Sequence, residues 1–250
     1  MGNIHGHRIN VDVVTPQGSS YEGDRNPDFL LSHDKHCIIV AIHTGPDGNV
    51  FFCDWSDKQV CHLNNPQIWD RTNGRMFKIS YDGAKPVKNL DLAKATTREL
   101  LEYQTHPNEW YSRHARRILQ ERFELKGDQT FFGANVLPFA DELALKHKDE
   151  HVRLRALWLF LSQGQITGDR LKQWLADESP TIRAWAIRAA VETSRKSFDL
   201  VRWLAPMAKD PSPIVRRTVA ECLLRHPQDG DKNSEVLAAL LSHAEDANDH

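Results

Sequence analysis

Four related segments recur along the last part of the sequence, and this repetition constrains the fold more than any other feature. When Tyr111, Val152, Ile182 and Val215 are taken as equivalent, the copies follow one another at steps of 41, 30 and 33 residues. Such steps are typical of helical solenoids. Because a single helix pair cannot bury its own apolar stripe, we expect the pairs to stack into an array.

Each copy carries a signal for the start of a helix. At Ser179-Pro180 and Ser212-Pro213, the serine can cap free amide groups, and the proline occupies the first helical position, where its missing N–H costs nothing. Asp149 and Asn108 can cap the other two copies. An apolar stripe follows each start. The partner helices are expected just before, over residues 135–145, 169–175, 198–208 and 233–241.

This half of the chain resembles HEAT repeats, in the form Asp-x-Ser-Pro-x-Val-Arg at residues 210–216 and in a weaker form at residues 177–183. That family often builds an internal ladder from the aspartate and the arginine, which implies this role for Asp210, Arg183 and Arg216. Helix capping with a solvated arginine is the alternative, and both stay open. The first copy departs from the pattern, with Ser112 in place of the arginine.

Five tryptophans of this half fall at positions of the apolar stripes. We therefore expect them to lie in the core. They are Trp110, Trp158, Trp174, Trp185 and Trp203.

The last residues of the sequence fit the same period. Residues 233–241 correspond to a first helix, and residues 246–250 fall where the next capping turn would come. We expect the array to be truncated at this point. An open edge there would expose the faces of Leu237, Leu240 and Leu241.

Residues 1–83 carry β-strand signals instead, and residues 84–90 read as a connector to the helical part at residues 91–250. The stretch 21–34 is rich in Gly, Asn, Asp and Pro and is predicted to be a long loop. Residues 15–18 are predicted to form a turn. Strands of this length and spacing favour an antiparallel sheet of the sandwich or propeller kind. The expected strands are residues 7–14, 38–42, 49–55, 59–63 and 75–81.

Composition excludes several classes of function. The net charge of −2 gives no overall basic field for nucleic acid. The sequence has no apolar run long enough to span a membrane. Its first eight residues lack the basic and then apolar pattern of a secretory signal peptide.

Two of the four cysteines are candidates for a disulfide. If residues 49–55 and 59–63 form a hairpin that turns symmetrically about Asp57, Cys53 and Cys61 face each other at a separation that a disulfide can bridge. Two small buried thiols are the alternative. Residues 58–60 before Cys61-His62 do not provide the Cys-x-x-Cys-His motif of covalent haem c attachment.

A wider series of motifs resembles the membrane-bound dehydrogenase proteins of planctomycetes and their relatives. The motifs are Asn3-Ile4-His5-Gly6-His7-Arg8, Pro27-Asp28-Phe29-Leu30-Leu31, Gly45-Pro46-Asp47-Gly48, Asp54-Trp55, Trp69-Asp70-Arg71-Thr72-Asn73-Gly74-Arg75 and His106-Pro107-Asn108-Glu109-Trp110-Tyr111. The resemblance implies a large exported, extracytoplasmic parent. In it, a propeller similar to quinoprotein glucose and sorbosone dehydrogenases runs into HEAT repeats and then usually into a c-type cytochrome domain.

The resemblance also implies that this chain is a piece of such a parent. The fold expected is α+β, with the last blade of a propeller and part of another in residues 1–83, followed by a HEAT-type solenoid. The rest of the propeller would then be one partner, and a protein bound on the solenoid a second.

Oxidation of a sugar by a quinone needs a base, a cation over the developing charge and commonly a calcium ion. His5, His7 and Arg8 offer a base and a cation on one short segment, and Arg71 and Arg75 offer cations that could contact the cofactor. In the quinoprotein relatives the base belongs to an earlier blade, so hydrogen bonding within the loop is the alternative role for His5 and His7.

Structural roles are the other interpretation of the charged loop residues between residues 45 and 75. Arg71 and Arg75 can pair with Asp54, Asp57 or Asp70, and Asp54-Trp55 can lock the final blade. Asp47 and Asp70 are explained by turn chemistry without a metal, so no metal site is assigned to this chain.

The sequence leads to two hypotheses of function. In the first, the chain is the structural and interaction-bearing part of a quinone-dependent sugar or polyol oxidoreductase, with pyrroloquinoline quinone and calcium bound by the parent and no cofactor bound by this chain alone. In the second, the chain is a HEAT-repeat interaction scaffold with a β docking module and no redox activity.

Overall fold

The structure, a computed structural model, describes residues 1–55, 72–126, 133–193, 200–225 and 230–249. The chain divides into two compact units. One, the β unit, contains residues 1–15, 22–91 and 108–110, and the other, the helical unit, contains residues 16–21, 92–107 and 111–250. The fold is mixed α+β, as expected.

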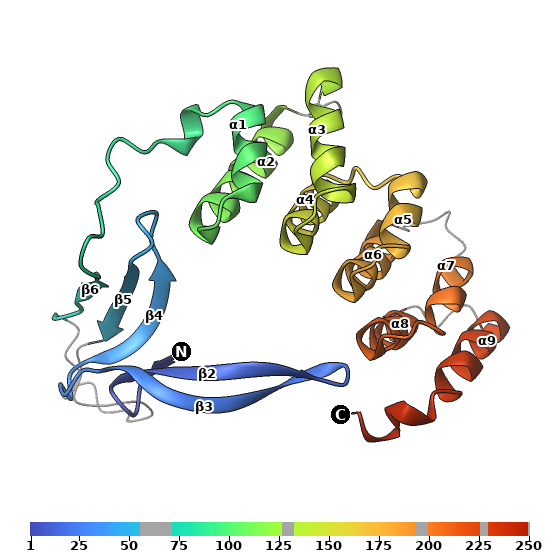
Figure 1. The fold of residues 1–250 in the computed structure, drawn as a ribbon, viewed down its shortest axis with the longest axis horizontal. Coiled ribbons are helices and arrows are strands. Elements are labelled where there is room, and N and C mark those ends of the chain that lie inside the picture. Colours follow the sequence, from blue (N-terminus) through green and yellow to red (C-terminus); the bar gives the residue numbers. More distant parts are fainter. Residues whose placement is uncertain (56–71, 127–132, 194–199, 226–229, 250) are drawn as a thin grey trace. The chain divides into compact units, whose positions relative to one another are not determined.

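Two small antiparallel sheets of three strands each hold the β strands (Figure 1). The first has the order β1-β2-β3 and the second the order β4-β5-β6. The described residues show no propeller. The strands are β1 (Gly2–Asn3), β2 (Arg8–Gln17), β3 (Ser20–Leu31), β4 (Ile38–Thr44), β5 (Val50–Trp55) and β6 (Met76–Ile79).

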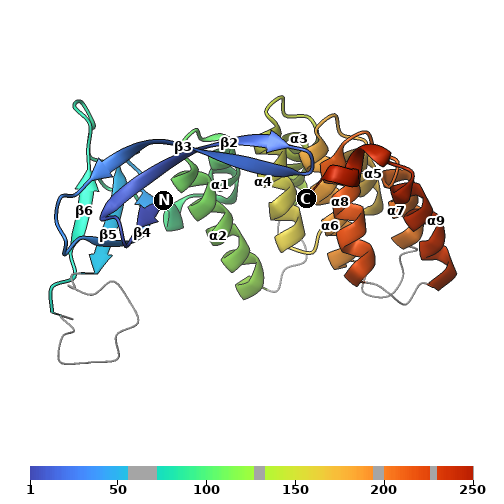
Figure 2. The ribbon, with the colours of Figure 1, turned by 90° about the horizontal axis from the view of Figure 1, so that it is seen from below.

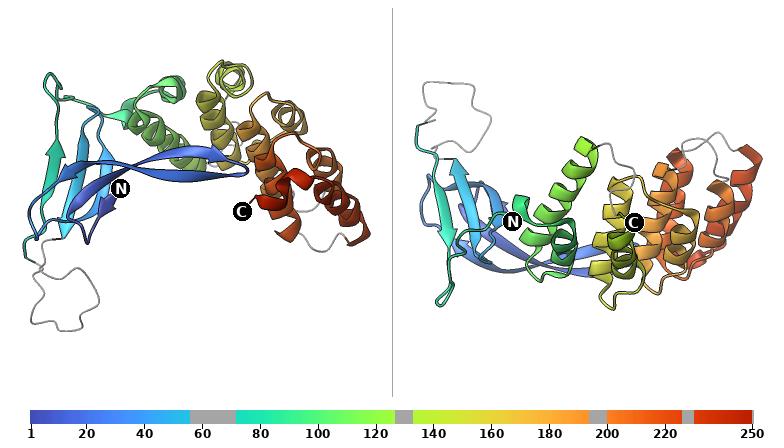
Figure 3. Two further views of the ribbon diagram at one scale, coloured as in Figure 1. Left: turned by 60° about the horizontal axis from the view of Figure 1, so that its bottom comes forward. Right: turned by 90° about the horizontal axis from the view of Figure 1, so that it is seen from above.

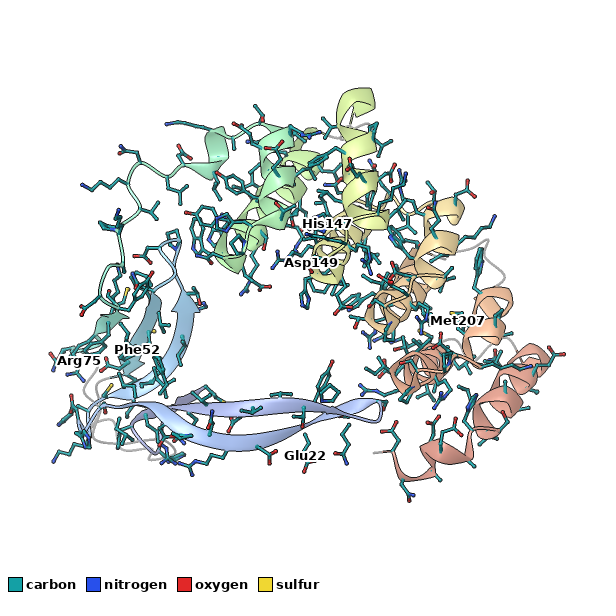
Figure 4. All side chains as sticks on the ribbon, viewed as in Figure 1. Glu22, Phe52, Arg75, His147, Asp149 and Met207 are labelled. Carbon is teal, nitrogen blue, oxygen red and sulfur yellow. The ribbon has the colours of Figure 1, made fainter. Side chains whose placement is uncertain are left out.

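The core of the β unit is small and draws on both sheets. Ile9, Cys37, Ile39 and Phe52 are buried together, and apolar residues of β3, β4 and β6 pack against them. The Phe52 ring, labelled in Figure 4, stacks on that of Phe77 with centroids 4.8 Å apart. Burial of this cluster places the two sheets against each other.

The predicted loop at residues 21–34 is wrong over most of its length, because β3 continues to Leu31. The predicted turn at 15–18 lies slightly too early, since β2 runs to Gln17 and Gly18 takes a positive φ of 57°. β3 is an edge strand, where Pro27 removes no hydrogen bond of a central ladder. Pairing with β2 thus overrides a composition typical of loops. The predicted strand at 59–63 lies outside the described residues.

The eight helices predicted from the repeats are confirmed, and they include three pairs, α3 with α4, α5 with α6 and α7 with α8. The starts predicted after Asn108, Asp149, Ser179 and Ser212 are the starts of α2, α4, α6 and α8, and the partner helices are α3, α5, α7 and α9. The helices are α1 (Thr97–Glu102), α2 (Glu109–Lys126), α3 (Gly133–Leu145), α4 (Glu150–Ser162), α5 (Gly168–Leu175), α6 (Pro180–Thr193), α7 (Leu200–Met207), α8 (Pro213–Arg225) and α9 (Gly230–Leu241), with short 3-10 turns at Leu92–Lys94, Tyr103–Thr105 and Ala244–Asn248.

Within the helical unit, the helices stand side by side in two rows (Figures 2 and 3). The even-numbered helices α2 to α8 lie on the inside of the curve in Figure 1, and the odd-numbered helices lie on the outside. α4 packs on α6 and α6 on α8, and each also packs on its odd-numbered partner. The largest buried side chains, Trp174 and Phe160 among them, fill the space between the rows.

A ladder of charged pairs connects the turns of successive repeats. Arg183 near the start of α6 donates from Nε and Nη2 to the Asp210 carboxylate at 2.7 and 2.8 Å, and from Nη1 to the carbonyl of Asp177 at 2.8 Å. Asp210 also accepts from the amide N–H of Ser212 at 2.8 Å. Arg183 therefore joins the turn of its own repeat to the turn of the next.

The same arrangement recurs in the repeats on either side. Each arginine donates to the carbonyl six residues before it and to an aspartate one repeat later. The equivalent pairs are Arg153 with Asp177, at 3.0 Å from Nη2 to Oδ1, and Arg216 with Asp246, at 2.7 Å from Nε to Oδ2. The sequence left two roles open for Arg183, Asp210 and Arg216, an internal ladder or helix capping with a solvated arginine. The structure contains the ladder.

Two further findings concern surfaces. Leu237 and Leu241 of α9 are exposed, and Leu240 is partly exposed. No helix among the described residues is both long enough and apolar enough to cross a membrane.

Candidate protein-interaction surface

The even-numbered helices present one face that points away from their odd-numbered partners, and we call it the inner face. On α4 and α6 almost all of the remaining positions are buried, so the partly exposed residues form a narrow stripe. The described residues of the inner face are Arg117 and Glu121 on α2; His151, Arg155 and Trp158 on α4; Thr181, Trp185, Arg188 and Glu192 on α6; and Ile214, Arg217, Glu221 and Arg225 on α8.

Two tryptophans form the centre of the inner face. Trp158 and Trp185 lie edge to face with their ring centroids 5.2 Å apart, and both are partly exposed. The core prediction is therefore wrong for this pair, and Trp110 and Trp203 are also only partly buried. It is correct for Trp174, which is fully buried and donates from Nε1 to the carbonyl of Ala144 at 3.0 Å.

Guanidinium groups cover both ends of the tryptophan pair. Arg116 of α2 lies over the Trp158 ring at 5.2 Å, and Arg188 of α6 lies over the Trp185 ring at 5.2 Å. Such cation–π contacts hold an aromatic ring in one orientation and are worth about 0.5–1 kcal/mol at exposed sites. The Nε1 atom of Trp158 is buried, and no described residue accepts its hydrogen bond.

A carboxylate continues this row onto α8. Glu221 accepts from Arg188 Nη2 at 3.3 Å and from Arg217 Nε at 2.9 Å. Although burial raises the pKa of Glu221, the two guanidinium groups lower it more, so that it lies below its usual value. An unbroken chain of aromatic and ionic contacts thus runs from α2 across α4 and α6 to α8. We call this chain, Arg116-Trp158-Trp185-Arg188-Glu221-Arg217, the ridge.

The outer row offers a different kind of surface. A cleft of about 510 Å³ opens between α5 and α7, lined by Leu175, Trp203, Pro206 and Met207, the last labelled in Figure 4. Its lining is apolar apart from Lys172. Among the described residues that line it, Lys172 is the one with a charged side chain.

Of the predicted catalytic residues, His5 and His7 lie in the turn between β1 and β2, and Arg8 is the first residue of β2. His5 is exposed. His7 has a positive φ of 48°, and its Nδ1 lies 3.3 Å from the carbonyl of Cys37. Arg8 donates to Asp28 on the neighbouring strand at 3.4 Å. His7 and Arg8 thus make local hydrogen bonds, as in the alternative structural role. A catalytic role for His5, His7 and Arg8 stays a prediction.

Arg75, predicted as a cofactor contact or a structural pair, lies against two carboxylates. It donates to Asp54 from Nε at 2.9 Å and from Nη2 at 2.6 Å, and it forms an ion pair with Asp34 at 2.9 Å. The Asp54 side chain is fully buried and also accepts from the Arg75 amide N–H. These bonds tie the strand of Asp54 to the start of β6, and Figure 4 labels Arg75 there.

The other predicted residues of the β unit lie in or beside residues 56–71. Of these, Asp70, Arg71 and Cys61 lie outside the described residues. Trp55 ends β5 with half of its surface exposed. Cys53 is a free thiol, and its neighbours across the sheet are Ala41 and Met76, so the described part of the structure does not contain the Cys53–Cys61 bridge.

No three or more His, Cys, Asp or Glu side chains lie together as a metal site in the part of the chain that the structure describes. The acidic loop residues have other partners. Asp47 accepts from Lys78 Nζ at 2.5 Å and from the amide N–H of Asn49, as a turn aspartate does.

The ridge was missed at the level of the sequence, although a signal for it exists. Trp185 occupies the position of Arg155 one repeat later, and Arg188 the position of Trp158. On helices that are apolar on almost every side, a tryptophan blends into the stripe. Listing residues by position in the repeat, rather than by hydropathy, separates the inner face from the core.

Comparison with known proteins adds one match. Residues 168–250 match the family model described as HEAT repeats, which covers α5 to the last turn. Comparison with curated proteins and with solved structures finds no match. Residues 168–250 are therefore a HEAT-repeat region, and the ladder extends beyond it to Arg153 of α4.

Proposed function

We propose that this chain is a protein-interaction scaffold whose helical unit binds a partner on the inner face. The observation that carries the proposal is the ridge, in which two partly exposed tryptophans lie between arginines on four successive even-numbered helices. Tryptophan and arginine are the residue types that contribute most to binding energy at protein interfaces. The match to HEAT repeats supports the same role, since such repeats commonly mediate protein interaction.

The buried ladder suits a scaffold. Stacked repeats keep a fixed spacing between neighbouring helices, so binding groups on successive helices are pre-organised and lose little entropy when a partner binds.

A selection experiment tests this proposal. A displayed library of random 12-residue peptides is selected on the immobilised chain, and the enriched peptides are measured on the Trp158→Ala/Trp185→Ala variant. We expect enriched peptides on the native chain and a loss of affinity of about tenfold or more on the variant, because each aromatic anchor contributes at least about 1 kcal/mol.

The matched control changes two exposed residues of the outer row, Lys172→Ala and Gln173→Ala on α5. This variant should keep the affinity of the native chain. Circular dichroism at 222 nm shows that both variants are folded. Absence of enriched peptides, or equal loss in the control, would contradict binding at the inner face.

A second proposal concerns the parent protein. The series of motifs supports an exported, extracytoplasmic dehydrogenase of the membrane-bound type, in which a propeller completed by other segments carries pyrroloquinoline quinone and calcium and oxidises a sugar or polyol. In that parent, residues 1–83 form the edge of the propeller, and this chain contributes structure and interaction rather than catalysis.

Dye reduction by the longest natural form of the protein tests the second proposal. The protein is loaded with pyrroloquinoline quinone and calcium and is assayed with aldoses and polyols. Substrate-dependent reduction supports the parent activity. No reduction with any of these substrates removes the redox hypothesis and leaves the scaffold.

A further inference from the structure

The turn of the β2–β3 hairpin, residues 16–21, belongs to the helical unit, and we call it the tip. Residues 12–18 and 21–27 of this hairpin are exposed, whereas Ser19 keeps only 6% of its surface exposed and Ser20 is partly buried. A buried serine at the end of an otherwise exposed hairpin shows that the tip is held by another part of the helical unit.

The geometry of the turn leaves the main chain of Ser19 open for this contact. β2 ends at Gln17 and β3 begins at Ser20, so Gly18 and Ser19 form a two-residue loop. A glycine in the first loop position, here with a φ of 57°, is typical of such hairpins. The amide and the carbonyl of the second loop residue have no partner in the ladder between the strands, so a buried Ser19 needs partners elsewhere.

Two charged side chains of the helical unit bind these main-chain groups. The amide N–H of Ser19 donates to the Asp249 carboxylate, at 3.0 Å from Oδ1 and 2.9 Å from Oδ2, and the carbonyl of Ser19 accepts from Arg217 Nη1 at 2.9 Å. A Cβ at Gly18 would lie 2.5 Å from Asp249 Oδ1, so the glycine also leaves room for the carboxylate. We call the contact of Ser19 with Arg217 and Asp249 the clasp.

The end of the ladder positions both charged groups of the clasp. Arg216 pairs with Asp246 in the last 3-10 turn, and Asp249 donates its amide N–H to the carbonyl of Asp246 at 3.0 Å. Arg217 follows Arg216 on α8, and it also donates to Glu221 of the ridge. The clasp therefore occupies the α8 end of the ridge.

On the basis of the proposed scaffold function, we propose that the tip is an autoinhibitory segment, which covers the α8 end of the inner face and is displaced when a partner engages the ridge. The contact is polar, because Pro16 and Tyr21 at the two ends of the tip are exposed. The clasp therefore depends on hydrogen bonds to charged groups, and it opens without exposing an apolar side chain of the tip. A partner of the whole ridge binds only the open form, so its apparent affinity falls with the fraction of open chains.

Hydrogen exchange of the Ser19 amide, followed by NMR on the full chain, tests the clasp itself. Asp249→Ala removes the acceptor, and Asp24→Ala, which changes the same charge at an exposed position of β3, is the control. We expect exchange about tenfold or more slower in the native chain than in Asp249→Ala, because a hydrogen bond to a charged group contributes a factor of this size. Asp24→Ala should exchange as the native chain does.

A second variant loosens the clasp from the other side. Gly18→Ala places a Cβ against the Asp249 carboxylate and should also accelerate exchange of the Ser19 amide. Its control is Gly48→Ala, which likewise puts alanine at a positive φ, of 76°, but where a Cβ meets no atom. Exchange at Ser19 that is as fast in the native chain as in Asp249→Ala and Gly18→Ala would overturn the clasp.

Peptide binding tests the inhibitory role. Random 12-residue peptides are selected on Asp249→Ala, and those whose affinity depends on Trp158 and Trp185 are then measured on the native chain and on Asp24→Ala. We expect both of these chains to bind about tenfold more weakly than Asp249→Ala, by the same factor as the slowing of exchange, since both measurements report the fraction of open chains. Saturating peptide should accelerate exchange of the Ser19 amide in the native chain.

Equal affinity of the native chain and Asp249→Ala, or a Ser19 amide that stays protected at saturating peptide, would overturn the competition between tip and partner. If neither chain enriches peptides, the scaffold function fails and the inhibitory role with it, while the exchange of Ser19 still decides whether the clasp forms. The proposed function and the clasp can therefore fail separately.

Discussion

Removal of one carboxylate from the ladder tests what holds the repeats together. In Asp210→Ala, the Arg183 guanidinium keeps its bonds to main-chain carbonyls but loses both donations to the carboxylate. The amide N–H of Ser212 loses its acceptor as well. The side chains involved are nearly closed to solvent, with 13% of Arg183 and 4% of Asp210 exposed.

These values set the expected magnitude. When one partner of a buried ion pair is removed, the remaining charge is left without compensation at a cost of about 3–5 kcal/mol. Because Arg183 keeps its two carbonyl acceptors, we place the loss near the lower limit, at about 3 kcal/mol. For a unit of this size, such a loss lowers Tm by roughly 6–12 °C.

Denaturant unfolding followed by circular dichroism at 222 nm measures this loss, and the exposed pair of Glu192 with Arg225 supplies the control. The side chains of that pair are 60% and 67% exposed, and their atoms lie 3.2 Å apart. Glu192→Ala should cost no more than about 1 kcal/mol, because solvent screens such pairs.

A loss below about 1 kcal/mol for Asp210→Ala would refute the ladder and favour capping with a solvated arginine. The double variant Arg183→Met/Asp210→Leu distinguishes the cause of a larger loss. It should recover much of the stability, since an apolar pair of similar volume replaces a buried ion pair at little cost. If it recovers none, the bonds that both variants or the double variant lose outside the ion pair account for the effect, namely the acceptor of the Ser212 amide and the donations to the carbonyls of Asp177 and Glu178.

Two further predictions concern the β unit. Gly45→Ala should destabilise it by about 1–3 kcal/mol in denaturant unfolding, because a Cβ there overlaps the Phe51 ring, whereas Gly23→Ala meets no atom and should be neutral. The hydrogen bond from Lys78 lowers the pKa of Asp47 to about 2, and the hydrogen bond from Asn49 contributes a smaller part of this shift. The stabilisation from the ionised carboxyl is therefore complete above about pH 4 and is lost as the pH falls through about 2. Carboxyl NMR titration should place the Asp47 midpoint there, and a midpoint unchanged in Lys78→Gln would contradict this cause.

The helical part of the fold could be predicted from the sequence because its signals are local and repeated. A serine, a proline and an apolar stripe recur in phase, and the helix starts follow from chemistry within a few residues. The β half shows the limit. Residues 21–31 have the composition of a loop, but the pairing with β2 makes them a strand, and no pattern within the segment reports that partner.

The candidate surface was less predictable than the fold. Arg183 and Asp210 are 27 residues apart, yet the repeat pattern and the resemblance to HEAT repeats suggested their role. For Trp158 and Trp185 the same period was present, but hydropathy placed both in the core. A helix that is apolar on nearly all sides carries no contrast in hydropathy between its buried and open faces, so hydropathy alone does not separate them.

The two sets of arginines on the even-numbered helices have linked roles. Arg153, Arg183 and the equivalent Arg216 are buried in the turns and fix each repeat against the next, while Arg188 and Arg217 remain accessible on the inner face. A binding site made of one residue per helix depends on the distance between helices, and the ladder sets that distance. Asp210→Ala, studied where it is still folded, should therefore weaken the binding of peptides selected on the native chain, because the ridge spans successive helices. An unchanged affinity for these peptides would show that the ladder stabilises the repeats without setting the geometry of the site.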